Sequence, residues 1–600
     1  MSSTSNVIAP ITDQYTYLDY KESFSNLRRT HIRGNPNGGL LAPGWVGIEH
    51  NRRMRAYVIY EDYYRNASRR WLNPDVDVQD RLDRREYGDA YVITEMLLSS
   101  LMGNQVKIFV EENDDDKEIP DPTDPLANAQ PDSPQSKYLD KLNEWAEKEK
   151  LFRRMAEVER NAIKLGDGVY VLGWSEKAKR PKLKIYNPGF YFPVLDEDTL
   201  DDNGWPTKVH IAYEFTKHVD GEIQLFLRRI TWHLREDLEQ PVKYKWNDKP
   251  SKWACYMTDA TWAMTSISDG PVQDMSIKNA VIREDFLDKN LGIDFLPVVH
   301  IPNWVSEEEH FGISTLGPLA QILDDIQAAD TDLSLSAATT GSPPIAVHNA
   351  ILEKDDEGRM RSYGPRTVLE TGEGGATLLD TSRSLDALLK YSEHLGDALS
   401  EKSRLPKTLL GRVDPSKVPS GIVMTLSFSP HSGLVRTMRL IREEKYQLML
   451  DFIGKMFWGA GEIDAMFEAN IKFGSYLPAD KTEVMNLVVQ GLTAHTISMD
   501  TAVLMLIEAG FPIDDSKQEI AKIVMENFDA AGKLVDATGD INAGRSRLGL
   551  PDQKVLPLMG GGFNPDGTPI DPTKPIPAPG GVPAPPVPPK PPAPPVPPKK

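Results

Sequence analysis

The sequence predicts an α+β protein made of several parts. Its 600 residues exceed what a single hydrophobic core usually organises. Helical spacing of apolar residues dominates up to residue 166 and again from residue 314, whereas short alternating segments rich in aromatic residues fill the interval. Hydrophobic residues make up 40% of the chain and charged residues 26%, which is ordinary for a folded protein.

Helices and one strand are expected in the first quarter of the chain. Residues 1–50 show little periodicity, and we expect them to follow a surface. Apolar spacing predicts helices over 51–67 and 82–102, a strand over 105–112 and one long amphipathic helix over 136–166. Gly166 and Gly168 are expected to close the last helix, because glycine readily adopts the left-handed conformation found after helices.

An acidic run interrupts these elements. Residues 111–124 hold eight acidic residues and one lysine, among prolines. A calcium loop is one interpretation, but the ligand order and the glycine of an EF-hand are missing. We therefore expect a solvated acidic loop over 111–134.

The interval between the helical parts is predicted to be an antiparallel β-rich region. Alternating segments predict strands over 168–174, 181–186, 207–215, 223–233, 242–246, 253–257 and 295–301. The turn dipeptides Asn203-Gly204 and Asp220-Gly221 separate some of them. Its repeated aromatic residues are interpreted as cross-strand packing, with a ligand-binding cluster as the alternative.

Strong helical patterns return after the β-rich region. Helices are expected over 314–338, 382–404 and 421–457, with strand-like pieces at 344–348 and 366–369 and a loop over 405–420. The first helix has an apolar face, and four aspartates are expected to lie away from it: Asp324, Asp325, Asp330 and Asp332.

The C-terminal part is expected to be helical and then disordered. A short strand is predicted near 471–473 and helices over 481–492, 499–509 and 516–528, while order is expected to fade beyond Gly539. The last forty residues contain 17 of the 47 prolines. Two PxxP segments followed by lysine permit an SH3 ligand, but an extended spacer or tail is the preferred interpretation.

Charge and cysteine content exclude several classes of protein. A formal net charge of −20 argues against a protein that grips nucleic acid tightly, but not against one that DNA slides past. Cys255 is the only cysteine, so the chain can form neither an internal disulfide nor a cysteine-based zinc site. We expect no secretory signal and no membrane-spanning helix, and a reducing cytoplasm fits.

Familiar catalytic motifs are missing. Gly454-Lys455 and Gly532-Lys533 lack the rest of a phosphate-binding loop. The segment 312–316 fails the GxSxG pattern, and His310 belongs to no HExxH pair. We therefore expect no enzyme, no cofactor and no metal site, with a metal-dependent nuclease as an alternative motivated only by the density of acidic residues.

Three blocks of sequence together resemble one known family. The first runs from Glu159 through Gly166-Asp167-Gly168 to Pro193, and the second from Phe311-Gly312-Ile313-Ser314 through Leu405-Pro406 and Pro419-Ser420-Gly421 into a long helix. The third starts at Leu477-Pro478-Ala479-Asp480. In this order, over roughly residues 85–530, they resemble the portal proteins of tailed bacteriophages, which connect head and tail.

The resemblance implies a division of the chain. After an N-terminal segment, 1–50, it implies a wing over 51–313, stem helices over 314–340 and 381–404 with a small α/β clip at 341–380 between them, a tunnel loop at 405–420, a long helix returning to the wing over 421–474, a helical crown over 475–540 and a proline-rich tail over 541–600. The acidic loop and the tail have no counterpart in the family pattern.

The resemblance also implies a function and partners. Portal subunits form a ring of about twelve copies at one capsid vertex. Double-stranded DNA passes through the ring, without sequence specificity, during packaging and ejection. Terminase and later head–tail adaptors bind the clip, and major capsid and scaffold proteins surround the ring. The implied location is the virion, after assembly in the host bacterial cytoplasm, without membrane contact.

Candidate channel residues follow from this division. Lys407, Arg412 and Lys417 lie in the loop that matches the tunnel loop and are candidates for weak DNA contact, although they could be ordinary solvated loop residues. The four aspartates of the first stem helix would repel phosphate in the lumen. Another head-assembly or connector protein is the alternative, because acidic, multidomain, cysteine-poor chains are common there.

Overall fold

A computed structural model describes most of the chain in two compact units. The described residues are 44–67, 85–110, 134–196, 200–201, 205–237, 242, 251–264, 270–305, 310–341, 345–348, 374–378, 382–410, 421–476, 481–513 and 516–548. The first unit is Met1–Asp514 and the second is Asp515–Lys600. The acidic run over 111–124 and residues 549–600 of the proline-rich tail lie outside the described residues.

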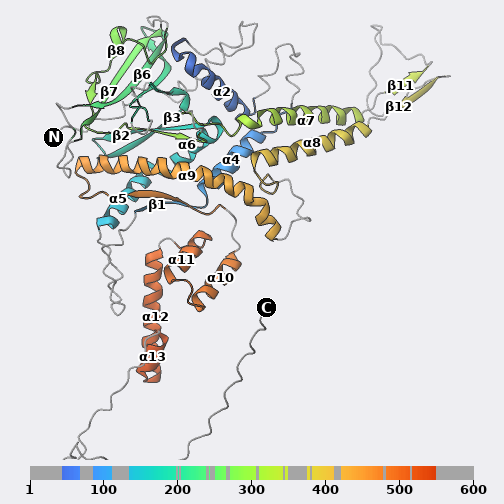
Figure 1. Cartoon of the computed structure of the whole chain (residues 1–600). Coiled ribbons are helices and arrows are strands. Elements are labelled where there is room, and N and C mark those ends of the chain that lie inside the picture. Colours follow the sequence, from blue (N-terminus) through green and yellow to red (C-terminus); the bar gives the residue numbers. More distant parts are fainter. Residues whose placement is uncertain are drawn as a thin grey trace, which may run out of the picture. The chain divides into compact units, whose positions relative to one another are not determined.

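The first unit begins with helices and one strand (Figure 1). After a short 3-10 turn at Gly44–Val46, the elements are α2 (Ile48–Tyr64), α4 (Asp89–Met102), β1 (Val106–Val110), α5 (Pro134–Glu149) and α6 (Leu151–Leu165). Helix α4 starts later than its spacing predicts, because Gly88 has a positive φ of 79° and residues 85–88 are not helical.

The single long helix expected over 136–166 is wrong. Lys150 adopts a left-handed conformation, with φ 54°, and separates α5 from α6. On one straight helix, the buried residues Leu142 and Leu151 would lie on opposite sides, because nine residues correspond to about two and a half turns. The break at Lys150 lets both apolar faces reach the same core.

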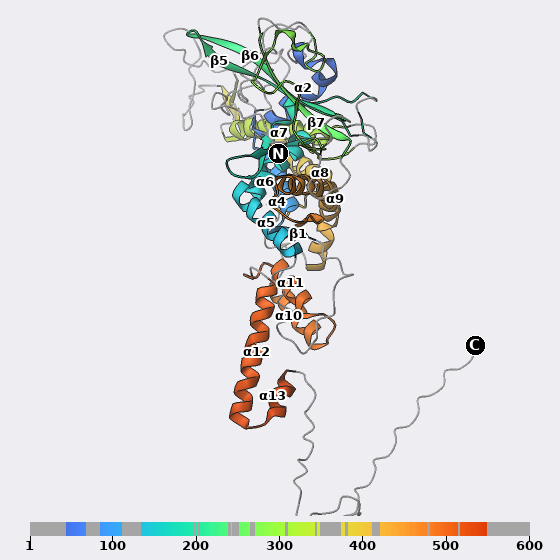
Figure 2. The ribbon, with the colours of Figure 1, turned by 90° about the vertical axis from the view of Figure 1, so that its left-hand side faces the viewer.

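Two antiparallel sheets follow. The strands are β2 (Asp167–Ser175), β3 (Arg180–Tyr186), β4 (Tyr191–Pro193), β5 (Lys208–Val219), β6 (Glu222–Glu236), β7 (Trp253–Ala263), β8 (Val281–Ile282), β9 (Lys289–Asn290) and β10 (Val298–Pro302). One sheet has the order β10-β2-β3, and the other has β4-β5-β6-β7-β8 with β9 also paired to β7. Strands β5 and β6 form a long hairpin (Figure 2) that turns at Asp220 and Gly221, as the sequence predicts.

The predicted strands agree with these elements except in detail. Strand β7 is longer than expected, and the short strands β4, β8 and β9 were not predicted. Of the expected strand over 242–246, only Val242 is described, and it forms an isolated bridge with Ser251.

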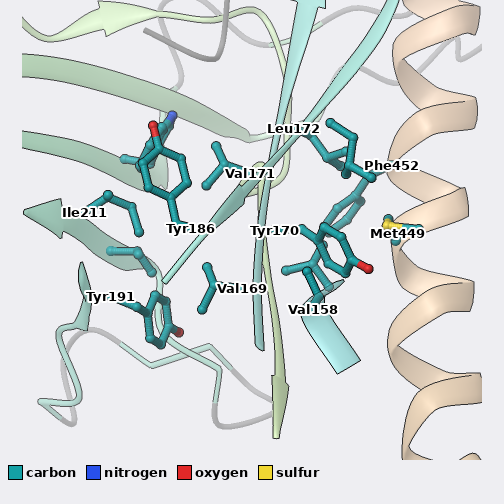
Figure 3. Packing of buried hydrophobic residues seen from close by; sticks show 14 of the residues in the cluster. Val158, Val169, Tyr170, Val171, Leu172, Tyr186, Tyr191, Ile211, Met449 and Phe452 are labelled. Atoms are coloured by element: carbon teal, nitrogen blue, oxygen red, sulfur yellow. The ribbon is translucent and has the colours of Figure 1, made fainter. Parts of the chain in front are cut away.

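Strand β2 lies at the centre of the core because both of its faces are covered. Figure 3 shows Val169 and Val171 on the side of Ile211 and Tyr191, while Tyr170 points toward the long helix that carries Met449 and Phe452. Eight successive residues of β2 are buried, which explains why its sequence does not alternate and carries no charged residue between Gly168 and Trp174.

The rest of the first unit is mainly helical. Its elements are α7 (Ala320–Gly341), preceded by a 3-10 turn at Gly317–Leu319, then β11 (Ile345–His348), β12 (Gly375–Leu378), α8 (Ser382–Ser403), α9 (Gly421–Ala460), β13 (Ala469–Phe473), α10 (Lys481–Thr493) and α11 (Met499–Glu508). Strand β11 pairs with β12, and β1 pairs with β13. The strand expected over 366–369 lies outside the described residues.

The second unit is a helical hairpin of α12 (Ser516–Thr538) and α13 (Ile541–Arg547). Order was expected to fade beyond Gly539, and this expectation is wrong for α13. Asp540 caps this helix by accepting a hydrogen bond from Asn542 N at 2.9 Å. Gly544 lies so close to α12 that a Cβ there would be 2.4 Å from Val535 Cγ2.

A buried ion pair fixes α9 against α6. Arg442 Nε lies 2.9 Å from Glu159 Oε2, and both side chains are 0% exposed. The same guanidinium donates to Asn303 O at 2.8 Å and to Asn303 Oδ1 at 2.9 Å, just after β10. Tyr446 OH donates to the second oxygen of Glu159 at 2.7 Å. Three elements are therefore joined by one cation.

Arg442→Met is predicted to destabilise the protein by about 3–5 kcal/mol, because it leaves the Glu159 carboxylate buried without its cation. Urea unfolding followed by tryptophan fluorescence measures the change. The double variant with Glu159→Gln should recover part of the loss. The control Arg436→Met, at an exposed position of α9, should stay within about 0.5 kcal/mol of wild type. If Arg442→Met and Arg436→Met lowered the free energy of unfolding equally, the buried ion pair of Arg442 and Glu159 would be refuted.

Candidate functional site: the α7–α8 helix pair and its base

Helices α7 and α8 form a helix pair (Figure 1). Ser392 Oγ donates to Asp330 Oδ1 across the pair at 3.1 Å. The end nearest residues 320 and 403 packs into a second hydrophobic cluster, which includes Leu319, Leu323, Ile326, Leu395, Leu399, Leu405, Leu434 and Met438. The end nearest residues 341 and 382 carries exposed apolar side chains, including Leu335 at 67%. Among the described residues, the pair is therefore anchored in the body at the end nearest residues 320 and 403.

The segment that opens α7 is bound to the end of α6. The last carbonyls of a helix have no partner within it. Here Ser314 Oγ donates to Lys164 O at 2.6 Å, and Thr315 N donates to Ile163 O at 3.0 Å. Asn303 N donates to Gly166 O at 2.7 Å. These bonds complete the end of α6 and fix the direction in which α7 leaves it.

Two glycines make this junction possible. Gly166 has φ 111°, a conformation that disfavours residues with a side chain. A Cβ on Gly166 would lie 2.4 Å from Gly312 O, and a Cβ on Gly312 would lie 2.2 Å from Gly166 O. The backbones of the two segments therefore touch directly. Two of the three sequence blocks that carry the family resemblance meet at this contact.

Asp167 lies between the two glycine segments and is fully buried. Its carboxylate accepts hydrogen bonds from Gly312 N at 2.8 Å and from the Tyr57 hydroxyl, and lies 2.7 Å from His300 Nε2. Burial, reinforced by the charge of Asp167, raises the pKa of Tyr57 well above its ordinary value, so this hydroxyl stays protonated and donating. The turn is thus bonded to α2, β10 and the start of α7.

A stack of rings covers the carboxylate. His310 lies against His300 with ring centroids 4.7 Å apart, and its Nε2 is 2.9 Å from the Tyr191 hydroxyl. Burial, with the charge of His300, lowers the pKa of His310 to about 3. The ring is therefore neutral at neutral pH, and its Nε2 forms a hydrogen bond with the Tyr191 hydroxyl in which both groups are uncharged.

The four aspartates of α7 have different surroundings. Asp324 accepts a hydrogen bond from Tyr63 OH at 2.9 Å. Asp330 faces α8 through Ser392, although we expected it to lie away from the apolar face, because it is one turn beyond the buried Ile326. Asp325 is half-buried and Asp332 is exposed. These last two are seven residues apart and share one face of the helix.

The loop after α8 is described only at its start. Leu405 is buried, and its carbonyl accepts a hydrogen bond from Ser400 Oγ at 2.6 Å, which ends the helix. Lys407 is exposed and forms an ion pair with Asp397 of α8. Arg412 and Lys417 lie outside the described residues.

A groove of about 880 Å³ lies near this junction, beside β10 and α9. His300, His310, Glu444 and Lys445 contribute to its otherwise largely apolar wall. In the parts of the chain that the structure describes, no three acidic, histidine or cysteine side chains are grouped so as to hold a metal ion. Within the same described residues, no helix combines the length and apolar composition needed to cross a membrane.

Sequence reasoning missed the residues that hold the junction together. Asp167 was noticed only as part of a turn, and Asn303 was not singled out. Arg442 carried a usable signal, because it occupies the same helical stripe as the buried Met438 and Tyr446. A charged residue within a buried stripe implies a buried partner, although its identity requires the fold.

Comparisons with known proteins give a limited result. No protein-family model matches the chain, and neither does any curated protein. A chain of the virion of a native gene transfer agent particle is similar with a TM-score of 0.35 and 14% identity, covering 80% of this chain and 98% of that one. A chain of the neck of an empty gene transfer agent particle gives 0.37 and 13%, covering 77% and 94%. Values this low do not establish a common fold.

Gly312→Ala is predicted to destabilise the junction by about 1–3 kcal/mol, because the new methyl group meets the Gly166 backbone. The control is Gly433→Ala in α9, where a Cβ would meet nothing within 4 Å. That control should be neutral or stabilise by up to about 1 kcal/mol. Thermal unfolding compares them, and a Gly312→Ala protein as stable as the control would contradict the close backbone contact.

Proposed function

We propose that the chain is the subunit of a portal ring at one capsid vertex, through which double-stranded DNA passes. The observation that carries the proposal is the junction of Gly166 and Gly312, which sets a helix pair on a β-rich body. The paired strands β11 and β12 lie between α7 and α8 in the sequence, and the 40-residue helix α9 follows α8. This order of elements is the order on which the family resemblance of the sequence rests.

Exposed apolar side chains support assembly into a ring. On the helix pair, Leu389 is 43% and Tyr391 is 49% exposed, in addition to Leu335. On α9, Leu426 and Leu440 are 67% and 59% exposed. Burying one such side chain contributes about 1.5–3 kcal/mol. Neighbouring copies packed side by side would cover these residues, whereas an isolated chain leaves them in water.

The charges of the helix pair suit a channel. In a ring of about twelve copies, the shared face of Asp325 and Asp332 would repeat as rings of carboxylates. Carboxylates repel DNA phosphates, which prevents a moving duplex from binding tightly. Lys407, Arg412 and Lys417 would add weak, sequence-blind attraction in the loop. The ion pair with Asp397 weakens the attraction that Lys407 would exert on DNA.

The proposal extends to partners and location. Strands β11 and β12 would contact terminase during packaging and head–tail adaptors afterwards, while capsid and scaffold proteins would contact the outside of the ring. The protein would act without catalysis, as part of the virion.

Another connector protein of the phage head is the alternative. Crosslinking strands β11 and β12 to terminase or to an adaptor distinguishes a portal protein from it. If duplex DNA stays intact when it is incubated with the protein and Mg²⁺ or Mn²⁺, the alternative of a nuclease is refuted.

Electron microscopy of the purified protein is predicted to show closed rings with a central hole. Leu323→Pro should abolish them, because Leu323, the fourth residue of α7, is buried in the base of the helix pair, and proline there removes this apolar packing and clashes with the carbonyl of Leu319. The matched control Leu323→Met keeps the helix and a similar volume, and should assemble normally. Wild-type protein that stays monomeric, or normal rings from the proline variant, would overturn the proposal.

The triple variant Lys407→Ala, Arg412→Ala and Lys417→Ala is predicted to assemble rings normally but to lower the yield of packaged DNA, because it removes the attraction that the loop cations would supply inside the channel. The control replaces three exposed lysines of the six-stranded sheet and its adjoining loops, Lys217, Lys252 and Lys278, by alanine. Quantifying DNA per particle compares the two. Equal yields from both triple variants would remove these residues from the channel site.

A further inference from the structure

One corner of the first unit is basic, although the chain as a whole carries a net charge of −20. It is formed by the turn between α5 and α6 and by the hairpin of β2 and β3. Residues 148–154 and 175–182 together hold eight cationic and two acidic residues, and Lys148 also forms an ion pair with Glu144, so the formal excess is five positive charges. We call these two segments the basic corner.

The fold brings the two segments together. Trp145 Nε1, near the end of α5, donates to Pro181 O in β3 at 2.9 Å. The Arg154 guanidinium, in the first turn of α6, donates to Leu183 O of the same strand. Both contacts are made by side chains that sit on the helices and reach the backbone of the hairpin. The corner is therefore part of the folded body.

A buried carboxylate organises its centre. Glu149 is 2% exposed, and its Oε1 lies 2.9 Å from Arg180 Nε and 2.7 Å from Lys182 Nζ. Arg154 Nη2 lies 3.8 Å from the other oxygen. One negative charge thus holds three cations, which leaves an excess of two. The three cations stay 25–39% exposed, so they are fixed in position yet accessible.

Further cations surround this centre. Lys150, Arg153, Lys177 and Lys179 are all exposed. Like charges repel one another within about 10 Å at moderate salt. Holding them at one corner is therefore unfavourable in the absence of a counter-charge. A polyanion that lies across the corner would remove this repulsion and release its own condensed counterions.

The surroundings favour nucleic acid over an acidic protein. Protein interfaces have apolar centres and are depleted in lysine. Residues 134–186, which the structure describes throughout, expose a single large apolar side chain, Phe152 at 37%. Arginine and lysine held on a rigid corner instead match the phosphate backbone of DNA.

We propose that the basic corner binds the phosphate backbone of double-stranded DNA without sequence preference. The residues belong to α5, α6, β2 and β3, so this surface is separate from the helix pair and from the loop after α8. The proposal goes beyond a channel function and does not require ring assembly.

The test measures the binding of the full-length protein to short fluorescent duplexes by anisotropy across a salt series. The variant combines Arg153→Gln, Lys177→Gln and Lys179→Gln, which spare the contacts of Glu149. Its control combines Lys217→Gln, Lys252→Gln and Lys278→Gln on the six-stranded sheet and its adjoining loops. Both triple variants remove three exposed charges, so a change in net charge alone affects them equally.

Wild type and control should bind two duplexes of unrelated sequence equally, more weakly as salt rises. The corner variant should bind at least about tenfold more weakly at low salt, and its log–log salt slope should fall by about 0.9 for each phosphate that the variant no longer neutralises. The proposal would be overturned if both triple variants bound DNA with equal affinity or if the wild-type protein did not bind DNA. It would also be overturned if the wild-type protein bound polyglutamate and not DNA. If the protein forms rings but does not bind DNA, only the proposal for the basic corner is refuted. If it binds DNA but forms no rings, only the proposal of a portal ring is refuted.

Discussion

The contact of Arg442 with Glu159 is the interaction on which the arrangement of the first unit depends. It is a fully buried ion pair, so its two charges lose their hydration and must find all their partners within the protein. Asn303 and Tyr446 supply those partners. Since Glu159 belongs to α6, Arg442 to α9 and Asn303 to the segment after β10, any shift of one element would leave a buried charge unsatisfied. The ion pair therefore fixes the relative position of α6, α9 and the segment after β10.

The direction of the helix pair follows from that position. Helix α6 ends at Gly166, whose backbone lies directly against Gly312, and Asp167 bonds the same turn to Gly312 N and Tyr57. These bonds use backbone groups and fully buried side chains, which leave little freedom for adjustment. At the other end of the helix pair, the described residues include exposed apolar side chains such as Leu335, which is 67% exposed.

The helices could be predicted from the sequence because their apolar periodicity is local. Helices α8 and α9 agree with the ranges that their spacing predicts, whereas α7 begins at Ala320, six residues after the predicted start at 314. The break at Lys150 was visible in principle, since the apolar face changes sides between Leu142 and Leu151. The helix after Gly539 was missed because it has only two turns, too few for a periodic signal.

The candidate site was predictable only in part. Two glycine-containing motifs were recognised separately, but a single sequence cannot reveal that Gly166 and Gly312 touch, because 146 residues separate them and the contact is between backbones. The same limit applies to side chains. Asp330 was assigned to the polar face from its charge, whereas its position on the helix turns it toward Ser392.

The distribution of charge matters more than its sum. A net charge of −20 argues against tight binding of DNA by the molecule as a whole, but electrostatic attraction acts over about one Debye length and is therefore local. In the proposed portal ring, Asp325 and Asp332 on α7 would disfavour phosphate along the path of the duplex. Glu149 does the opposite in the basic corner, since it neutralises one of three cations and fixes the others without covering them. An acidic protein can in this way resist DNA along one element and attract it at another.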